Sequence, residues 1–264
     1  MSLKLKDLYV RRFSTCLLVS LLALIPKAAT AQTLGFDFAV TPQVSTTGEA
    51  PLEWYTDRYA PCTFSGAANK VLTESVCASG YQTPTPSFSN TQGNKFDLLA
   101  GTNSLSILLY VPESWELLPE RLAGFWATAV NSSYAVGNDY PIIEFQGPIV
   151  NEVPGPSFYP NGGVAGFYGW NNISNSFAYI GLPTSFRYNS WVKLTMTLTG
   201  GQFTYTVANS EGNDGVSLSS PLYDSTESYL GNVILEGYNY DAPYSIEWKL
   251  LKFSFDSNGQ IVWN

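Results

Sequence analysis

The chain has 264 residues, with 13 basic and 21 acidic side chains, a formal net charge of −8 and no histidine. The absence of histidine excludes Ser-His-Asp and Cys-His catalysis and histidine-ligated zinc. Carboxylates, tyrosines and lysines are then the side chains left for acid–base chemistry. The negative charge disfavours nucleic acid and anionic lipid as partners.

Residues 1–31 have the features of an export signal. A basic region precedes an apolar run, Cys16 to Ile25, that is too short to span a bilayer. Ala29-Thr30-Ala31 supplies the small residues that a signal peptidase requires. We therefore expect cleavage before Gln32, a secreted or periplasmic location, and no membrane insertion after cleavage.

Cleavage at that point changes the charge of the protein further. Residues 1–31 contain five basic residues and one acid, so 8 basic and 20 acidic residues remain and the net charge becomes −12. No basic patch offsets this charge in the sequence. A neutral glycan is therefore favoured over an anionic polysaccharide, unless a bound cation intervenes.

Residues 32–95 are rich in Thr, Ser, Gly and Pro, with only short apolar runs. They predict edge strands and loops that cover a core, with a turn or extended connector at residues 84–88. The cysteines that follow the signal, Cys62 and Cys77, are expected to pair in an exported chain. The loop they would close contributes about 3 kcal/mol by the loop-entropy estimate.

The pattern of a core β-structure begins near residue 102. Apolar residues alternate with polar ones through residues 104–111, which indicates a strand with one buried face. Pro112 and Pro119 limit a helix predicted at residues 113–122 to a turn or two. Further strands are predicted at residues 122–130, 140–146, 164–170, 178–182, 229–238 and 245–255.

Two local patterns are sharper than the rest. Residues 191–207 read WVKLTMTLTGGQFTYTV, with period-two alternation on both sides of Gly200-Gly201, which predicts a β-hairpin. Within residues 245–255 the alternation shifts by one residue, which predicts a β-bulge or bend near Leu250-Leu251.

The regular strand spacing and the scarcity of helix predict an all-β protein. The expected architecture is a two-sheet antiparallel sandwich of jelly-roll type, built from about ten strands as a single domain over residues 32–264. Residues 100–255 are expected to form its core.

Several segments resemble the concanavalin A-like lectin and glucanase superfamily, and within it bacterial laminin G-like domains. The resemblance lies in GFWATAVNSSYAVGNDYPIIEFQG at 124–147, in GFYGWNN at 166–172 and in the hairpin opened by Trp191. The resemblance implies a concanavalin A-like jelly roll and a glycan-binding or adhesive module. The superfamily also contains glycoside hydrolases and polysaccharide lyases, so fold alone does not decide the function.

Two aromatic segments are candidate ligand-binding sites. Alternation places Tyr168 and Trp170 on one face of a strand, with Asn172 at its end, where they would form a platform for a sugar; the alternative is that they fill the core. The second segment, YNYDAPY, offers the residues typical of binding loops, although it could be a plain turn. Its candidate residues are Tyr238, Tyr240 and Asp241.

Three strand acids, Glu144, Glu236 and Glu247, are the candidates for catalysis. Glycosidases place two carboxyl groups either about 5–5.5 Å or about 6.5–9.5 Å apart. The E-x-D-x-x-E motif of one retaining group of the superfamily is absent. Glu144 would therefore need Glu236 or Glu247 on an adjacent strand, and the alternative is that each is a solvent-facing strand acid.

Two acidic loops are weak candidates for calcium, Asn138-Asp139 and residues 211–215. Neither has an ordered ligand spacing, and such segments are commonly turns. We therefore expect no cofactor, with calcium as the open alternative.

These observations favour a secreted, non-catalytic binding module, a lectin whose partner is a carbohydrate or a glycosylated surface. Two alternatives remain open. One is a glycoside hydrolase or polysaccharide lyase that uses carboxylate acid–base chemistry, and the other is a structural or adhesive extracellular protein without a small ligand.

Overall fold

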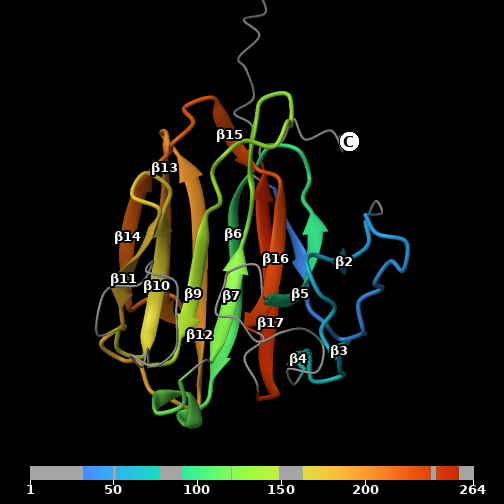
Figure 1. Ribbon diagram of the computed structural model, residues 1–264, viewed down its shortest axis with the longest axis vertical. Coiled ribbons are helices and arrows are strands. Elements are labelled where there is room, and N and C mark those ends of the chain that lie inside the picture. Colours follow the sequence, from blue (N-terminus) through green and yellow to red (C-terminus); the bar gives the residue numbers. More distant parts are fainter. Residues whose placement is uncertain are drawn as a thin grey trace, which may run out of the picture.

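The computed structural model describes residues 32–49, 52–77, 91–119, 121–148, 163–238 and 242–255. These residues form seventeen strands in two large antiparallel sheets and one two-stranded ribbon (Figure 1). The predicted signal peptide and the turn at residues 84–88 lie outside the described residues. The predicted all-β, two-sheet jelly-roll sandwich is confirmed.

The larger sheet contains eight strands. Its order is β14-β13-β12-β6-β17-β4-β3, and β1 also pairs with β17. The bounds are β1 Gln32–Phe36, β3 Thr63–Gly66, β4 Leu72–Val76, β6 Thr102–Val111, β12 Ser190–Thr199, β13 Gln202–Asn209, β14 Gly215–Pro221 and β17 Tyr244–Phe255.

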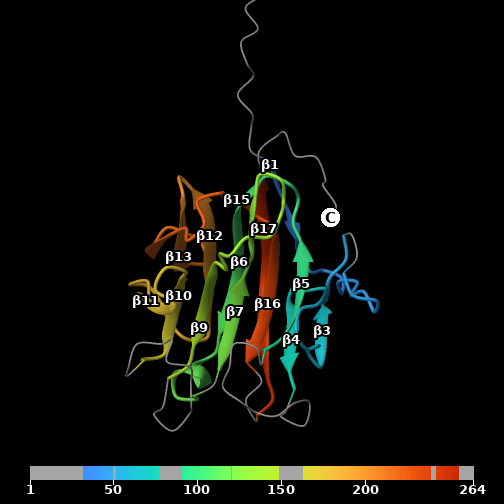
Figure 2. The ribbon, with the colours of Figure 1, turned by 45° about the horizontal axis from the view of Figure 1, so that its top comes forward.

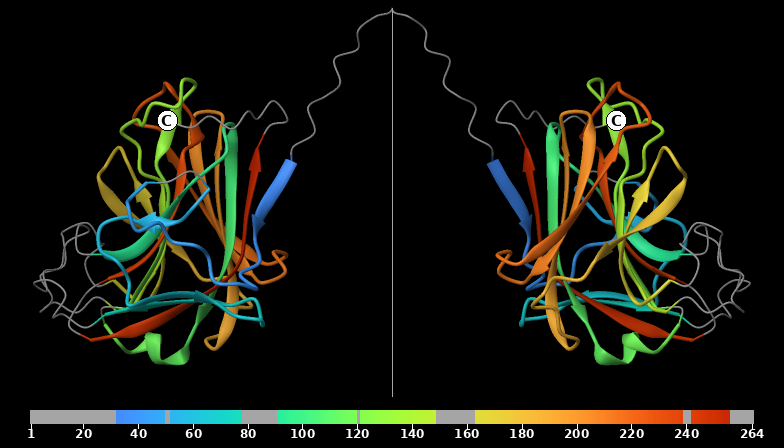
Figure 3. Two further views of the ribbon diagram at one scale, coloured as in Figure 1. Left: turned by 90° about the vertical axis from the view of Figure 1, so that its right-hand side faces the viewer. Right: turned by 90° about the vertical axis from the view of Figure 1, so that its left-hand side faces the viewer.

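The second sheet contains seven strands in the order β11-β10-β9-β7-β16-β5-β2. Its bounds are β2 Tyr55–Thr56, β5 Thr91–Asp97, β7 Leu122–Trp126, β9 Ile142–Gln146, β10 Gly166–Asn171, β11 Ser176–Gly181 and β16 Asn232–Tyr238. The ribbon pairs β8 (Ala129–Asn131) with β15 (Glu227–Leu230). Figure 2 and Figure 3 show the two sheets as layers stacked face to face.

The core lies between the two sheets and uses one face of each. Phe125, Phe145 and Phe167 enter it from the seven-stranded sheet, and Tyr205 and Trp248 from the eight-stranded sheet. All five side chains are completely buried. Because successive strand residues point to opposite faces, the residues between them point outward from the sandwich.

The hairpin predicted at residues 191–207 is confirmed as β12 and β13. Thr199 pairs with Gln202, so the loop contains only Gly200 and Gly201. Their φ angles of 62° and 77° are both positive, which is the requirement of the two-residue type I′ turn and which glycine meets without strain. The β-bulge predicted near Leu250-Leu251 is also confirmed, because the register of β17 on β6 shifts between Lys249 and Lys252.

The short helix predicted from residue 113 is confirmed as one 3₁₀ segment, Glu113–Glu116. The strands predicted at 122–130 and 229–238 were wrong in their bounds, because each is divided between a sheet strand and the β8–β15 ribbon. Residues 32–95 contribute more than edges, because Trp54 and Leu72 are fully buried in the core and β4 and β5 lie inside their sheets. Within the described ranges, no helix combines the length and apolar character needed to cross a bilayer.

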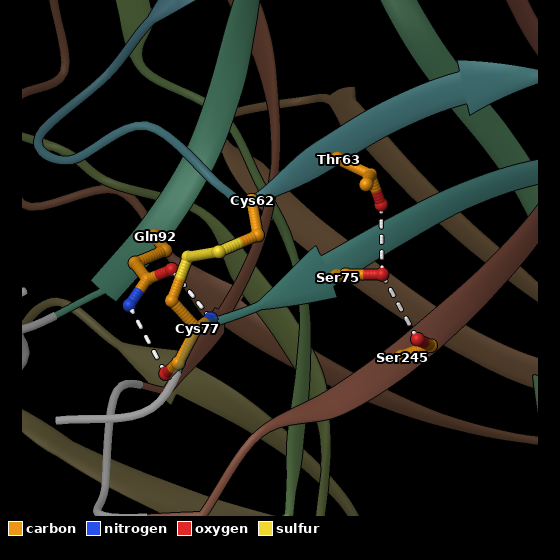
Figure 4. The surroundings of a disulfide bond; sticks show 6 residues. All are labelled: Cys62, Thr63, Ser75, Cys77, Gln92 and Ser245. Carbon is orange, nitrogen blue, oxygen red and sulfur yellow. Dashed lines mark hydrogen bonds between the residues drawn. A yellow bond between two sulfur atoms is a disulfide. The ribbon is translucent and has the colours of Figure 1, made fainter.

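The predicted disulfide joins Cys62 and Cys77, across the open ends of β3 and β4 (Figure 4). The Gln92 side chain holds the same end of β4, because its Oε1 accepts a hydrogen bond of 2.8 Å from the Cys77 N–H. Beside it, hydroxyl groups connect three strands: Thr63 donates to Ser75, which is 3.0 Å from Ser245. The disulfide therefore attaches β3 to the inner strand β4.

One carboxyl group lies inside the core. Glu74 on β4 faces the same way as the core residues Leu72 and Val76 and is completely buried. Its Oε2 accepts a hydrogen bond of 2.9 Å from Trp248 Nε1. Burial raises the pKa of Glu74 to about 8, although the Trp248 bond opposes part of this shift.

The disulfide predicts a large stability effect. The Cys62→Ser/Cys77→Ser double variant should lose about 3 kcal/mol of unfolding free energy, because the unfolded chain gains the entropy of an open 15-residue loop. Denaturant unfolding with and without a reductant measures this loss. The reductant should lower the stability of the wild type and leave the double variant unchanged, and an equal shift in both would contradict the prediction.

Glu74 predicts a pH dependence. Its carboxyl group binds a proton more tightly in the folded state, so its contribution to stability is lost as pH rises from about 4.5 to about 8. Glu74→Gln should therefore stabilise the protein by a few kcal/mol at pH 8 and by much less at pH 5. Unfolding curves across this range test the prediction, with Glu247→Gln as a charge-matched control. A Glu74→Gln effect that is independent of pH would overturn it.

Candidate functional site

The outer face of the seven-stranded sheet carries most of the sequence-predicted site residues. Tyr168 pairs with Glu144, and Glu144 pairs with Gly124, which in turn pairs with Glu236. Tyr179 extends the row on the other side of Tyr168. Since Phe145 and Phe167 on the same strands point into the core, these neighbouring residues point outward.

Glu144 and Glu236 are therefore two strands apart on one face, with a glycine between them. With a strand spacing of about 4.8 Å, their Cα atoms lie about 10 Å apart. Glu247 is not part of this row, because it lies on β17 in the opposite sheet, paired with Tyr110 and Thr73. The structure thus brings together Glu144 and Glu236 and rules out a pair that includes Glu247.

Glycines on both sides of Glu236 make room for it. A Cβ atom at Gly93, its partner on β5, would lie 2.5 Å from the Glu236 Cβ. A Cβ atom at Gly124 would lie 2.6 Å from Trp126 Nε1 and 3.2 Å from the Glu236 Cγ. Neither position accommodates a larger residue without movement of the side chains at the site.

Both carboxyl groups are completely buried, so the expectation of solvent-facing acids was wrong. Glu236 Oε2 lies 3.1 Å from Arg58 Nη1, while its Oε1 has no hydrogen-bond partner within the described ranges. Burial raises the pKa of Glu236 well above its usual value; Arg58 opposes the shift, whereas Asp57 and Glu144 add to it. Glu144 Oε2 accepts a hydrogen bond of 3.2 Å from Trp126 Nε1.

Arg58 connects the acids of this face. Its Nη1 lies 2.7 Å from Asp57 Oδ2, and its guanidinium group lies 5.2 Å from the centroid of the Trp126 ring. The arrangement holds a cation against an aromatic ring, between the buried Glu236 carboxyl group and the partly buried Asp57. Neither Arg58 nor Trp126 was identified from the sequence, since Arg58 lies 178 residues from Glu236.

Aromatic rings gather beside Glu144. Tyr168 is 1% exposed, its hydroxyl donates to the Val164 carbonyl at 2.7 Å, and burial raises its pKa to about 12. Trp170 is half-buried and packs edge-on against Phe177, with ring centroids 5.0 Å apart. Tyr179 is 42% exposed and packs at 5.2 Å against Tyr168. The faces assigned to Tyr168 and Trp170 were correct, and Trp170 and Tyr179 offer more accessible surface than Tyr168.

The remaining predicted binding residues have different surroundings. Asn172 is buried, and its Oδ1 accepts a hydrogen bond of 2.9 Å from the Tyr140 N–H, so it fixes a loop beside the end of β10. Tyr238 follows Glu236 by two positions on β16 and is half-buried on the same outer face. Tyr238, the described residue of the second predicted patch, thus shares a sheet face with Tyr168 and Trp170. Tyr240 and Asp241 lie outside the described residues.

The candidate calcium loops form hydrogen-bonded turns. Asp139 is buried, and its two carboxylate oxygens accept from the backbone N–H groups of Tyr223 and Asp224, at 3.0 and 2.8 Å. In the loop at 211–215, the Asn213 side chain donates to Glu211 and bonds to Asn209. In the described part of the chain, no three acidic or cysteine side chains gather as a metal site.

Comparison with known proteins identifies the fold. No protein-family model matches the sequence, and no curated protein matches it. Among solved structures, the CBM2 module of the evolved Dit protein of Lactobacillus casei BL23 phage J-1 is similar, with a TM-score of 0.50 and 10% identity. The structural match covers 89% of this chain and 99% of that module.

The winged bean acidic lectin, solved in complex with methyl-α-D-galactose, has a TM-score of 0.51 and 12% identity. It matches over 86% of this chain and 99% of the lectin chain. The chain therefore has the concanavalin A-like jelly-roll fold. The closer resemblance to laminin G-like domains stays a prediction.

Proposed function

We propose that the protein is a carbohydrate-binding module whose ligand binds on the outer face of the seven-stranded sheet. The observation that supports this most directly is the accessible ring surface of Trp170 and Tyr179 on this face, beside the buried row of Glu236, Glu144 and Tyr168 across adjacent strands. Aromatic surface with a few fixed polar groups is the usual composition of a small-molecule site.

The side chains supply the two interactions that a sugar needs. Trp170 and Tyr179 offer ring surface for the C–H groups of a pyranose, and the partly exposed Arg58 offers a charged donor for hydroxyls, held in place from below by the buried Glu236. The similarity in fold to a lectin solved with methyl-α-D-galactose and to a CBM2 module agrees with this function. Because identity is 12% or less, the site residues carry the proposal.

A second candidate is a glycoside hydrolase that uses Glu144 and Glu236. The favouring observation is that the two buried carboxyl groups share a face across Gly124, and that burial, with a smaller contribution from Glu144, raises the pKa of Glu236. A carboxyl group with a raised pKa that shares a face with a second carboxyl group is the arrangement expected of a general acid and its partner. Glu236 would be the acid.

We also propose that the protein is exported. The Cys62–Cys77 disulfide supports this, because disulfides persist in oxidising compartments. A fusion of the full chain to a reporter that is active only after export would test it. Activity that is lost on deletion of residues 1–31 is expected, and activity retained without them would contradict the signal peptide.

The binding proposal predicts a loss on substitution of Trp170. On an array of neutral glycans, the wild type should bind a selected set, and Trp170→Ala should weaken that binding about tenfold or more, because the largest accessible ring of the face is removed. Trp191→Ala is the matched control, since it removes a half-buried tryptophan from the opposite sheet. Equal loss in both variants, or a folded wild type that binds no glycan, would refute the site.

The hydrolase candidate predicts a different result. If the protein cleaves the glycan that it binds, Glu236→Gln should lower kcat by about 10²- to 10⁴-fold, since an amide cannot donate the proton to the leaving oxygen. Glu247→Gln, on the other sheet, should retain full activity. Release of reducing sugar measures the rate, and its absence in the wild type would exclude this candidate while leaving the binding proposal intact.

A further inference from the structure

We propose that the outer face of the eight-stranded sheet is a second binding surface, which takes an acidic polysaccharide on three lysines. Lys193 on β12 and Lys249 on β17 both pair with Leu108 of β6, while Lys252 pairs with the neighbouring outward residue Ser106. With strands about 4.8 Å apart, the Cα atoms of Lys193 and Lys249 lie about 10 Å apart. Lys193, Lys249 and Lys252 thus form one basic group on this face, which the sequence did not indicate.

The β-bulge in β17 creates this cluster. In a regular strand, residues 249 and 252 would point to opposite faces of the sheet. The register shift between them places both on the outer face, and Leu250 within the bulge has a φ of 51°. A leucine in the left-handed region is strained, and such strain is typical of functional sites. The bulge thus keeps two cations side by side.

Among the residues that the structure describes, none of the three lysines forms an ion pair with a carboxylate. Residues 32–264 contain eight basic side chains, of which Arg58, Lys70 and Lys95 form such pairs. The Lys249 ammonium group lies 4.3 Å from the centroid of the Trp191 ring, and Trp191 in turn packs against Tyr110. Among the described strand residues of this sheet, Glu247, two residues before Lys249, is the one acid on the outer face, and Glu211 follows Ser210 in the loop beside Lys193. An unpaired positive cluster on an otherwise acidic protein favours an anionic ligand.

A hollow lies between two of the lysines. It has a volume of about 90 Å³, and Ser106, Lys193, Ser210 and Lys252 contribute to its lining, with Leu108 and Leu250. Lysine and serine side chains are hydrogen-bond donors of the kind that a carboxylate or a sulfate group accepts from.

The rest of the face indicates a polysaccharide as the bearer of that group. Hydroxyl side chains form a continuous row across six strands, namely Thr33, Ser254, Ser104, Thr197, Thr204 and Ser219. A parallel row contains Ser106, Thr195, Thr206 and Ser217 beside Lys252. This extended polar surface offers hydrogen bonds to a chain of sugar hydroxyls, whereas a bilayer would require apolar side chains for insertion.

The test uses the purified protein with three probes: polygalacturonate, dextran sulfate and neutral dextran. The wild type should bind one or both anionic polymers and not dextran, and added salt should weaken the binding. Lys193→Gln/Lys252→Gln should weaken it about tenfold. The control variant Lys70→Gln/Arg187→Gln, which removes the same charge elsewhere, should change it less than about twofold. The stronger of the two polymers identifies carboxylate or sulfate as the group recognised.

Several outcomes would overturn the proposal. These are equal affinity for dextran, equal loss in the control variant, or tighter lysine-dependent binding to phosphatidylglycerol vesicles than to the polymers. A dimer that dissociates in Lys193→Gln/Lys252→Gln would instead make this face an interface between two copies of the chain. Trp170→Ala should leave binding to the anionic polymers unchanged, so this test and the neutral-glycan test fail separately.

Discussion

The packing of one face of each sheet against the other is the constraint on which the rest of the structure depends. Large residues from both sheets, such as Phe125, Phe145 and Trp248, fill the space between them and are fully buried. Because successive residues of a strand point to opposite faces of the sheet, every second residue then lies on an outer face, whatever the chemistry of its side chain. The core therefore needs no contribution from either outer face, and both candidate surfaces are found there.

The two outer faces differ in the free energy that is lost by burying their polar residues. The face of the seven-stranded sheet buries Glu144 and Glu236, although burial of a carboxyl group is unfavourable and the core gains nothing from it. Arg58 and Trp126 offset part of that cost, and Gly93 and Gly124 give up side-chain packing to make room. A buried acid with a shifted pKa, which is present although it lowers the stability of the fold, is characteristic of a functional site.

The sequence alone predicted those features of the structure that depend on residues close together in the chain. Alternation alone placed Tyr168 and Trp170 on one face of their strand, and the shift of alternation near Leu250 located the bulge. What could not be predicted depends on the order of strands in a sheet. Glu144 and Glu236 meet because β7 lies between β9 and β16, and Arg58 arrives from a segment that the sequence indicated only as an edge.

The order of the strands also explains why the net charge of the chain did not indicate the basic group on the eight-stranded sheet. Net charge describes the whole molecule, whereas a bound ligand contacts only one face of it. Lys193 and Lys249 are far apart in the sequence and become neighbours because β6 lies between β12 and β17. Their surface and the Glu144–Glu236 surface lie on opposite sides of the core and share no residue. Because the two surfaces share no residue and lie on opposite sides of a close-packed core, we expect a substitution on one outer face to leave the other intact, so that each surface can evolve its own ligand.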